Sequence, residues 1–303
     1  MTDLVAGIEA GGTKMLCAVA TVDGCVVAQQ RIATAAPEET FAAIADFYRR
    51  AHDRHGPVEA GGVASFGPLD LDRGSPRYGS LAATPKPGWS SVDMRVRLAA
   101  ILDAPVAIDT DVNCAALAEQ RYGAGQGLDR LCYVTIGTGI GMGWIEGGRL
   151  AVGMGHPEAG HLRMPRAPGD EAFAGTCPYH GDCLEGLACG PAIAARWGES
   201  AELLAQDHVG WQYEAHYIAC LCVDLMYAMR PQRIILGGGV MAGPSLYDRV
   251  RRRFAELAGG YALDRWSSDP VRFICSPGLQ NPSAGLVGAI ELAIGVAAAA
   301  DAR

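Results

Sequence analysis

The chain has 303 residues, of which half are apolar and 19% are charged, and its formal net charge is −8. This length suggests about two domains and is enough for a sizeable hydrophobic core. The acidic balance lacks the basic surface of a nucleic-acid binder and disfavours binding to an anionic membrane.

Three apolar segments separated by short glycine turns open the chain, and they predict antiparallel strands at Leu4–Ala10, Met15–Val22 and Val26–Ile32. The first turn reads EAGGTK, from Glu9 to Lys14, and does not contain the G-x4-G-K-[ST] pattern of a P-loop. Gly11 and Gly12 would expose backbone N–H groups to an anion, with Thr13 and Lys14 beside them. An ordinary glycine hairpin explains this turn equally well.

The next segments are a helix, a strand, a long loop, a short helix and a buried strand, at Pro37–His55, Val58–Ser65, Phe66–Ser91, Val92–Leu102 and Val106–Ile108. The loop contains TPKPGW. Of the 25 basic residues only Lys14 and Lys86 are lysines, one in each of these two loops. Chance could produce this distribution, but it favours a need for a compact ammonium group at both places.

The strand at Val106–Ile108 leads into Asp109-Thr110-Asp111-Val112-Asn113, and a helical pattern follows from Cys114 to Tyr122. A carboxylate between a strand end and a helix start is well placed for chemistry in an α/β fold. Asp111 is also a good helix N-cap, so this position alone leaves both roles open.

A second glycine turn, TIGTGIG, connects two predicted strands at Leu131–Ile136 and Met142–Glu146. It repeats the strand, turn and strand design of EAGGTK. Two such hairpins, one in each half of the chain, predict a duplicated domain.

Further predicted helices are Pro191–Ala205, Trp211–Met229, Pro244–Ala258 and Ala284–Ala300, and further strands are Arg233–Leu236 and Val271–Ile274. Residues 237–242 fit the G-x-G-x-x-A dinucleotide fingerprint, but the acid expected after the next strand is missing, so the match is weak. We expect no signal peptide, because Leu4–Ile8 already has strand character. The apolar tail from Leu292 to Ala300 is too short to span a bilayer.

Between these elements, Cys177, His180 and Cys183 have C-x2-H-x2-C spacing, which suits a structural zinc ion. His161 is the expected fourth ligand, with His156 and Cys189 as substitutes. The surrounding metal segment, residues 155–186, is rich in glycine and poor in large apolar residues, so a metal would explain how it is ordered. Two buried free cysteines and a surface histidine are the alternative. The other cysteines are expected to be free thiols in a reducing cytoplasm.

Three polar residues lie near the two ends of this metal segment, namely Glu158, His161 and Glu185. They could hydrogen-bond a small polyhydroxylated ligand, or they could be solvated surface residues.

In this order, EAGGTK, DTDVN, TIGTGIG and GHPEAGH…CPYHGDCLEG resemble the ROK family of sugar kinases and repressors. The resemblance covers essentially the whole chain and is nearest to the bacterial fructokinases of that family. It implies an α/β, two-domain actin/hexokinase-like (ribonuclease H-like) ATPase fold with a cleft between the lobes. Glu9 stands where most members have Asp, and most relatives have more cysteines at the metal.

The expected lobes are 1–110, with the C-terminal helix 284–300 packing back on it, and 111–283, which carries the zinc loop 156–183. The resemblance implies ATP-dependent phosphorylation of D-fructose to fructose 6-phosphate with Mg²⁺, and a cytoplasmic homodimer. It makes Asp111 the base that accepts the proton of the sugar hydroxyl. The remaining implied roles are phosphate contacts at Gly11, Gly12, Thr13, Lys14, Thr138 and Gly139, nucleoside contacts at Gly238, Gly239 and Gly285, and sugar contacts at Asn113, Glu158, His161 and Glu185.

The sequence is compatible with other functions. Glucose, mannose or an N-acetylated hexosamine could be the sugar, and a non-catalytic sugar sensor could share the fold. A ROK-like repressor would need a helix-turn-helix before the first strand, and only three residues precede Leu4. A nicotinamide dehydrogenase would have to use the weak fingerprint at residues 237–242.

Overall fold

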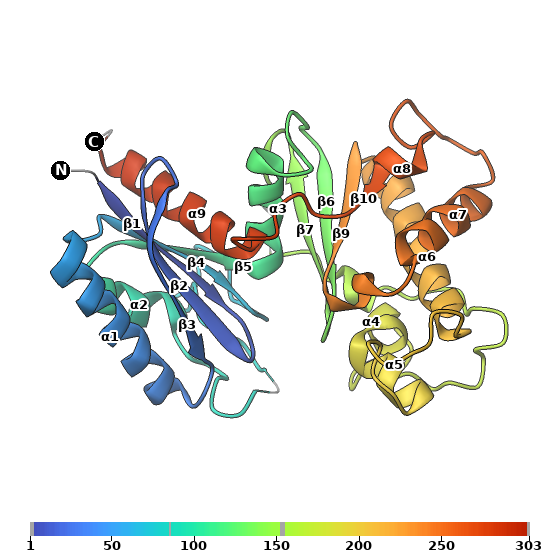
Figure 1. The fold of residues 1–303 in the computed structure, drawn as a ribbon, viewed down its shortest axis with the longest axis horizontal. Helices are drawn as coiled ribbons and strands as arrows, with labels where there is room; N and C mark the ends of the chain where they lie inside the picture. The colour runs from blue at the N-terminus through green and yellow to red at the C-terminus, as the bar shows by residue number, and fades with distance from the viewer. Residues whose placement is uncertain (1–2, 85, 152–154, 302–303) are drawn as a thin grey trace. The chain divides into compact units, whose positions relative to one another are not determined.

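The computed structural model describes residues 3–84, 86–151 and 155–301, and they form two compact units. Of these residues, unit 1 contains those up to Ala118, residues 155 and 156, and those from Leu279 onward. Unit 2 contains Glu119–Ala151 and Pro157–Gly278. Each unit is a five-stranded mixed sheet with helices packed against it (Figure 1).

In unit 1 the strands lie in the order β3-β2-β1-β4-β5. The three antiparallel strands are β1 (Leu4–Ala10), β2 (Lys14–Thr21) and β3 (Val26–Ala33). On the other side of β1, β4 (Ala60–Ser65) and β5 (Val106–Thr110) continue the sheet in parallel. This arrangement gathers the carboxyl ends of β1, β4 and β5 at one edge, where ligands of open α/β sheets usually bind.

Helices cover both faces of this sheet (Figure 1), namely α1 (Pro37–His55), α2 (Met94–Leu102) and α9 (Ala284–Asp301). Alternate residues of β1 serve the two faces, because Ile8 packs with the core under α1 and α2 while Val5 packs with α9. Glycine lets α9 approach closely: a Cβ on Gly62 would lie 1.9 Å from the carbonyl oxygen of Ala289. The start of α3 (Asp111–Tyr122) follows β5 directly.

Unit 2 has the sheet order β10-β9-β6-β7-β8. Its central hairpin pairs β6 (Leu131–Ile136) with β7 (Ile140–Glu146), and β8 (Arg149–Leu150) extends it. Parallel to β6 lie β9 (Arg233–Gly237) and β10 (Ile274–Cys275). The helices α6 (Gly210–Met229) and α7 (Leu246–Ala258) pack on each other, and their apolar faces join Val134 and Leu236 in one core.

The remaining elements of unit 2 are short. They are η1 (Ala159–His161), α4 (Leu184–Ala188), α5 (Gly190–Trp197), η2 (Gly239–Ala242) and α8 (Pro270–Phe273).

Two sequence expectations are wrong in unit 2. Residues 270–273 are helical, because Asp269 accepts hydrogen bonds from the amides of Val271 and Arg272 and Pro270 suits a first helical turn. The helix expected to reach Ala205 ends at Trp197, because Gly198 adopts a left-handed conformation.

The two sheets share one topology. Each has three antiparallel strands, built on a glycine hairpin, and two parallel strands beside the first strand of that hairpin. The recurrence of EAGGTK and TIGTGIG therefore marks a true structural duplication.

All ten cysteines are free thiols, as expected. Among the described residues, no helix has both the length and the apolar character needed to span a membrane.

Candidate active site and metal centre

Three carboxylates gather at the edge of the unit 1 sheet where β1 and β5 end. Glu9 is the second-last residue of β1, Asp109 is in β5, and Asp111 begins α3. Burial raises the pKa of both aspartates, Glu9 raises the pKa of Asp111 further, and His156 opposes the rise for both, so these four groups interact electrostatically. Both aspartates of the sequence motif DTDVN, Asp109 and Asp111, thus belong to one group of interacting charges.

Asp111 has the properties of a general base. Burial, more than any other cause, raises its pKa to about 6, while the backbone N–H of Val112 donates to its Oδ1 at 2.9 Å and opposes that shift. The nearby Glu9 carboxylate raises it further. Asp111 is therefore a carboxylate at neutral pH, but one that binds a proton more readily than an exposed aspartate.

The side chains of Asp109 and Asn113 are hydrogen-bonded to each other. The Asn113 Nδ2 donates to Asp109 Oδ1 at 2.7 Å, and the Thr110 amide donates to the same oxygen at 2.8 Å. Asn113 is 5% exposed. The sugar contact expected for Asn113 thus falls on a side chain whose amide already holds Asp109 in place.

The first glycine hairpin has its backbone carbonyls bonded internally. Gly11 O accepts from Thr34 Oγ1 at 2.8 Å, Thr13 O accepts from Thr34 N at 3.1 Å, and Gly12 O accepts from Lys86 Nζ. Gly12, Thr13 and Lys14 are exposed. Within the described chain, the amides of Gly12 and Thr13 have no hydrogen-bond acceptor, so this turn presents donors to its surroundings.

Gly285 lies against Glu9, not in open space. A Cβ on Gly285 would be 2.9 Å from Glu9 Cδ and Oε1, and Ser283 Oγ donates to Glu9 Oε2. The start of α9 is therefore joined to the end of β1 within unit 1. A larger residue at this position would displace the Glu9 carboxylate.

The second hairpin, in unit 2, is held by Glu185. Its Oε2 accepts from the amide of Ile140 at 2.9 Å, and a Cβ on Gly139 would lie 2.7 Å from the same oxygen. Thr138 is exposed at the tip of this turn. Glu185, expected from the sequence to contact sugar, is thus attached to the hairpin expected to contact phosphate.

The glycines after β9 lie beside this second hairpin. Gly238 has φ of +93°, and a Cβ there would be 2.2 Å from the carbonyl oxygen of Ile136. A Cβ on Gly137 would lie 3.9 Å from Gly239 N. Thr138, Gly139, Gly238 and Gly239, expected to serve one nucleotide, therefore lie in neighbouring turns within unit 2, and all four are at least partly exposed.

Glu158 precedes the short helix η1 and His161 is its last residue, and η1 packs on the start of β7. A Cβ on Gly160 would be 2.2 Å from Ile140 O, so glycine is needed for this contact. Glu158 is exposed, and its carbonyl accepts from His161 N at 3.0 Å. Ile140 therefore contacts both η1, through its carbonyl, and Glu185, through its amide. These contacts connect Glu158 and His161 with Glu185.

Four residues of unit 2 form a candidate metal centre: His161, Cys177, His180 and Cys183. Their ligand atoms all lie within 4.8 Å of one another. His161 Nδ1 is 3.8 Å from Cys177 Sγ and 3.5 Å from Cys183 Sγ, and His180 Nδ1 is 3.6 Å from Cys177 Sγ. A tetrahedral zinc ion with its usual bond lengths separates S and N ligands by about 3.5 Å. This set therefore fits zinc, whereas His156 and Cys189 are not part of any such group in the described residues.

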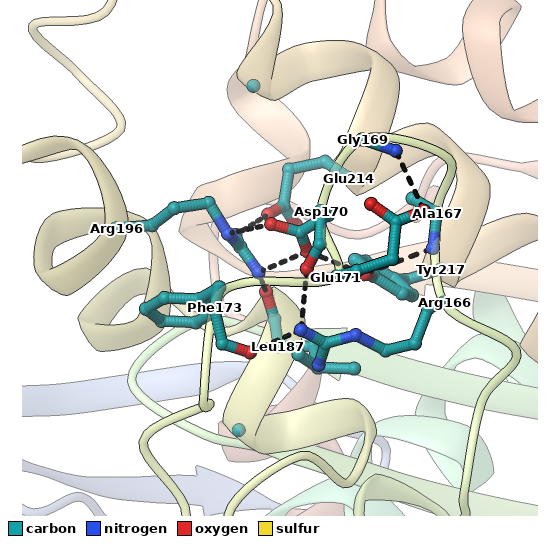
Figure 2. A network of polar contacts seen from close by, with 12 residues as sticks. Arg166, Ala167, Gly169, Asp170, Glu171, Phe173, Leu187, Arg196, Glu214 and Tyr217 are labelled. Carbon is teal, nitrogen blue, oxygen red and sulfur yellow. Dashed lines mark hydrogen bonds and ion pairs between the residues drawn. The ribbon is translucent and has the colours of Figure 1, made fainter.

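A buried ionic network, which the sequence did not reveal, ties the metal segment to the helices (Figure 2). Arg196 of α5 pairs with Asp170 at 3.0 Å and donates to Leu187 O at 2.7 Å. Glu214 of α6 lies 3.6 Å from the Arg196 guanidinium, and the three charged side chains are at most 4% exposed. Tyr217 OH also donates to Asp170 Oδ2 at 2.5 Å. The network joins the end of α4, two residues past Glu185, to the middle of the metal segment.

Comparison with known proteins connects these features to one family. A family model described as the ROK family matches residues 5–296. A fructokinase from Zymomonas mobilis is 42% identical over 290 residues, covering 95% of both chains. A fructokinase from Streptococcus mutans is 38% identical over 300 residues, covering 98% of this chain and 100% of the relative. The structure of a ROK family glucokinase from Streptomyces griseus, in complex with glucose and AMPPNP, has a TM-score of 0.72 at 27% identity and covers 96% of this chain and 99% of its own.

Proposed function

The chain belongs to the ROK family, and from that premise we propose that it is an ATP-dependent kinase that converts D-fructose to fructose 6-phosphate. The observation that carries the proposal is identity near 40% to several fructokinases over nearly the whole of each chain. The actin/hexokinase-like fold, with its two glycine hairpins, supplies the matching architecture.

Asp111 would act as the general base for the 6-hydroxyl of the sugar. Phosphoryl transfer requires mainly positioning and charge stabilisation, so a carboxylate aimed at the attacking hydroxyl is the main chemical group required. Its interaction with Glu9 and the burial that raises its pKa support this role. Mg²⁺ bound with the nucleotide would neutralise charge on the phosphates.

The remaining residues would bind and orient the two substrates. The turns at Gly11–Gly12 and Thr138–Gly139 would receive phosphate oxygens, with Thr13 and Lys14 beside the first turn. Gly238, Gly239 and Gly285 would lie beside the nucleoside. Glu158, His161 and Glu185 would hydrogen-bond the sugar, and Asn113 would orient Asp109 and the loop that carries the base.

We propose zinc at His161, Cys177, His180 and Cys183, where it would order the segment that carries Glu158 and His161. Thiolate and imidazole ligands at these spacings favour zinc over hard cations such as Mg²⁺. The free cysteines are compatible with a cytoplasmic protein. A homodimer is part of the same proposal, by analogy with the family.

The rate should depend on pH through Asp111. Because its pKa in the folded protein is about 6, the carboxylate fraction falls as the pH decreases through that value. We expect kcat/KM for fructose to be level from about pH 7 to 8 and to fall about tenfold per pH unit well below pH 6. Initial rates from pH 5 to 8 at constant ionic strength would measure this. A level profile down to pH 5 would remove Asp111 from the role of base.

The test of the proposed activity is a coupled assay of ADP release over a panel of hexoses. Fructose, glucose, mannose and an N-acetylated hexosamine would be compared at equal concentration. Release that depends on fructose supports the proposal. Release that depends on another hexose would change the substrate, and nucleotide binding without release would indicate a sugar sensor.

A further inference from the structure

Lys86 is a basic residue to which the proposed roles above assign no function, although it contacts the first glycine hairpin. Its ammonium donates a hydrogen bond to the carbonyl oxygen of Gly12, 74 residues earlier in the chain. Lys86 and Lys14 are the only lysines among 25 basic residues, and both lie at this hairpin. Within the described residues neither lysine forms an ion pair, whereas many of the arginines do.

The loop that carries Lys86 is fixed to unit 1 by a buried anchor. Trp89 is fully buried, and its Nε1 donates to Ala35 O at 3.0 Å. Ser90 Oγ bonds the amide and the carbonyl of Thr84, which closes the loop around Lys86. These contacts hold the chain on both sides of Lys86, which reduces the entropy lost when its ammonium binds a ligand.

The polarity of the hairpin shows what kind of ligand suits it. The carbonyls of Gly11, Gly12 and Thr13 are all engaged as acceptors inside unit 1, and Lys86 engages the middle one. The amides of Gly12 and Thr13 have no acceptor within the described chain. A turn with occupied carbonyls and available N–H groups attracts anions, and the Lys86 ammonium against the Gly12 carbonyl adds a positive charge at this turn.

We propose that Lys86 is a phosphate-binding residue, which completes an anion site with the amides of Gly12 and Thr13 and receives a phosphate group of the nucleotide. A lysine ammonium has three donors, of which one bonds Gly12 O, so the others can bind phosphate oxygens. This proposal rests on the proposed kinase function for the identity of the ligand. It does not depend on which sugar is phosphorylated.

Lys86→Gln removes the charge but keeps an N–H donor on the side chain. We expect ATP and inorganic tripolyphosphate to lose affinity by a factor on the order of 10 to 100, the value of a charge-assisted hydrogen bond. Adenosine should bind as it does to the wild type, and Lys86→Arg should recover part of the loss. Isothermal titration calorimetry of the full chain, with and without added salt, would measure these affinities. Arg54→Gln, which removes an exposed cation from the last turn of α1, is the matched control.

Two outcomes would overturn the assignment. In the first, Lys86→Gln binds ATP within about twofold of the wild type, which would leave the lysine only its contact with Gly12 O. In the second, adenosine and ATP lose affinity equally and the melting temperature falls, so that the residue acts on the fold of the hairpin. If the wild type binds ATP but does not phosphorylate fructose, the proposed activity fails while the Lys86 measurement still decides its own question. If the wild type binds neither ATP nor tripolyphosphate, both proposals fail.

Discussion

Asp111→Asn should reduce kcat for fructose phosphorylation by at least about 100-fold, because general-base catalysis commonly contributes 10²- to 10⁴-fold. Asparagine has nearly the same shape and can still accept the Val112 amide hydrogen bond, but it cannot take the proton of the hydroxyl. Fructose affinity, measured by calorimetry without nucleotide, should change less than about threefold. The variant therefore separates chemistry from binding.

The same substitution should not destabilise the protein at pH 8. The pKa of Asp111 is higher in the folded chain than its ordinary value of 3.8, so its stabilising contribution is complete at low pH and is lost as the pH rises through about 6. At pH 8 the buried Asp111 carboxylate is charged, which costs folding free energy. Replacing Asp111 with a neutral amide removes this cost. Thermal unfolding would check this, with Asp103→Asn as the control, since Asp103 is exposed in a left-handed position that asparagine tolerates. Turnover of Asp111→Asn within about tenfold of the wild type would contradict the assignment.

Removal of the metal should cause the second large effect, which is loss of order in part of the metal segment. Structural zinc contributes its binding free energy to folding, so a strong chelator should lower the melting temperature and abolish turnover. Amide hydrogen exchange should rise most at residues 159–161 and 176–183. It should rise less at residues 166–173, because Asp170 and its ion pair with Arg196 hold that stretch independently of the metal.

Cys183→Ser should reproduce the effect of the chelator, with metal content falling well below one zinc per chain. Cys189→Ser is the matched control, because Cys189 is similarly buried but is not part of the candidate metal group. It should keep its zinc. Full activity of the freshly purified protein without any bound metal would refute a structural zinc.

The parts of the fold that were predictable from the sequence are those with strong local signals. Apolar runs broken by glycine turns marked both hairpins, and their recurrence indicated the duplicated sheet. The C-x2-H-x2-C spacing predicted three ligands of one metal group, and His161 joins them. These signals are readable because each depends on residues that are close together in the chain.

The remaining features depend on partners that are distant in the sequence. Asp170, Arg196 and Glu214 come from three separate segments, and no local pattern predicts that such charged residues are buried together. The bond between Glu185 and the Ile140 amide spans 45 residues. Residues 271–274 looked like a strand because three of the four are apolar, but Asp269 and Pro270 begin a helical turn that ends at Phe273, and only Ile274 lies in β10. Short apolar runs do not distinguish these two structures.

Product analysis with purified protein, ATP, Mg²⁺ and a panel of hexoses tests the central claim most directly. We predict one ADP released per fructose consumed, fructose 6-phosphate as the product by NMR, and kcat/KM for fructose at least about tenfold above that for glucose, mannose or an N-acetylated hexosamine. A higher kcat/KM for any of those hexoses, or ADP release that no hexose stimulates, would contradict the assignment as a fructose kinase.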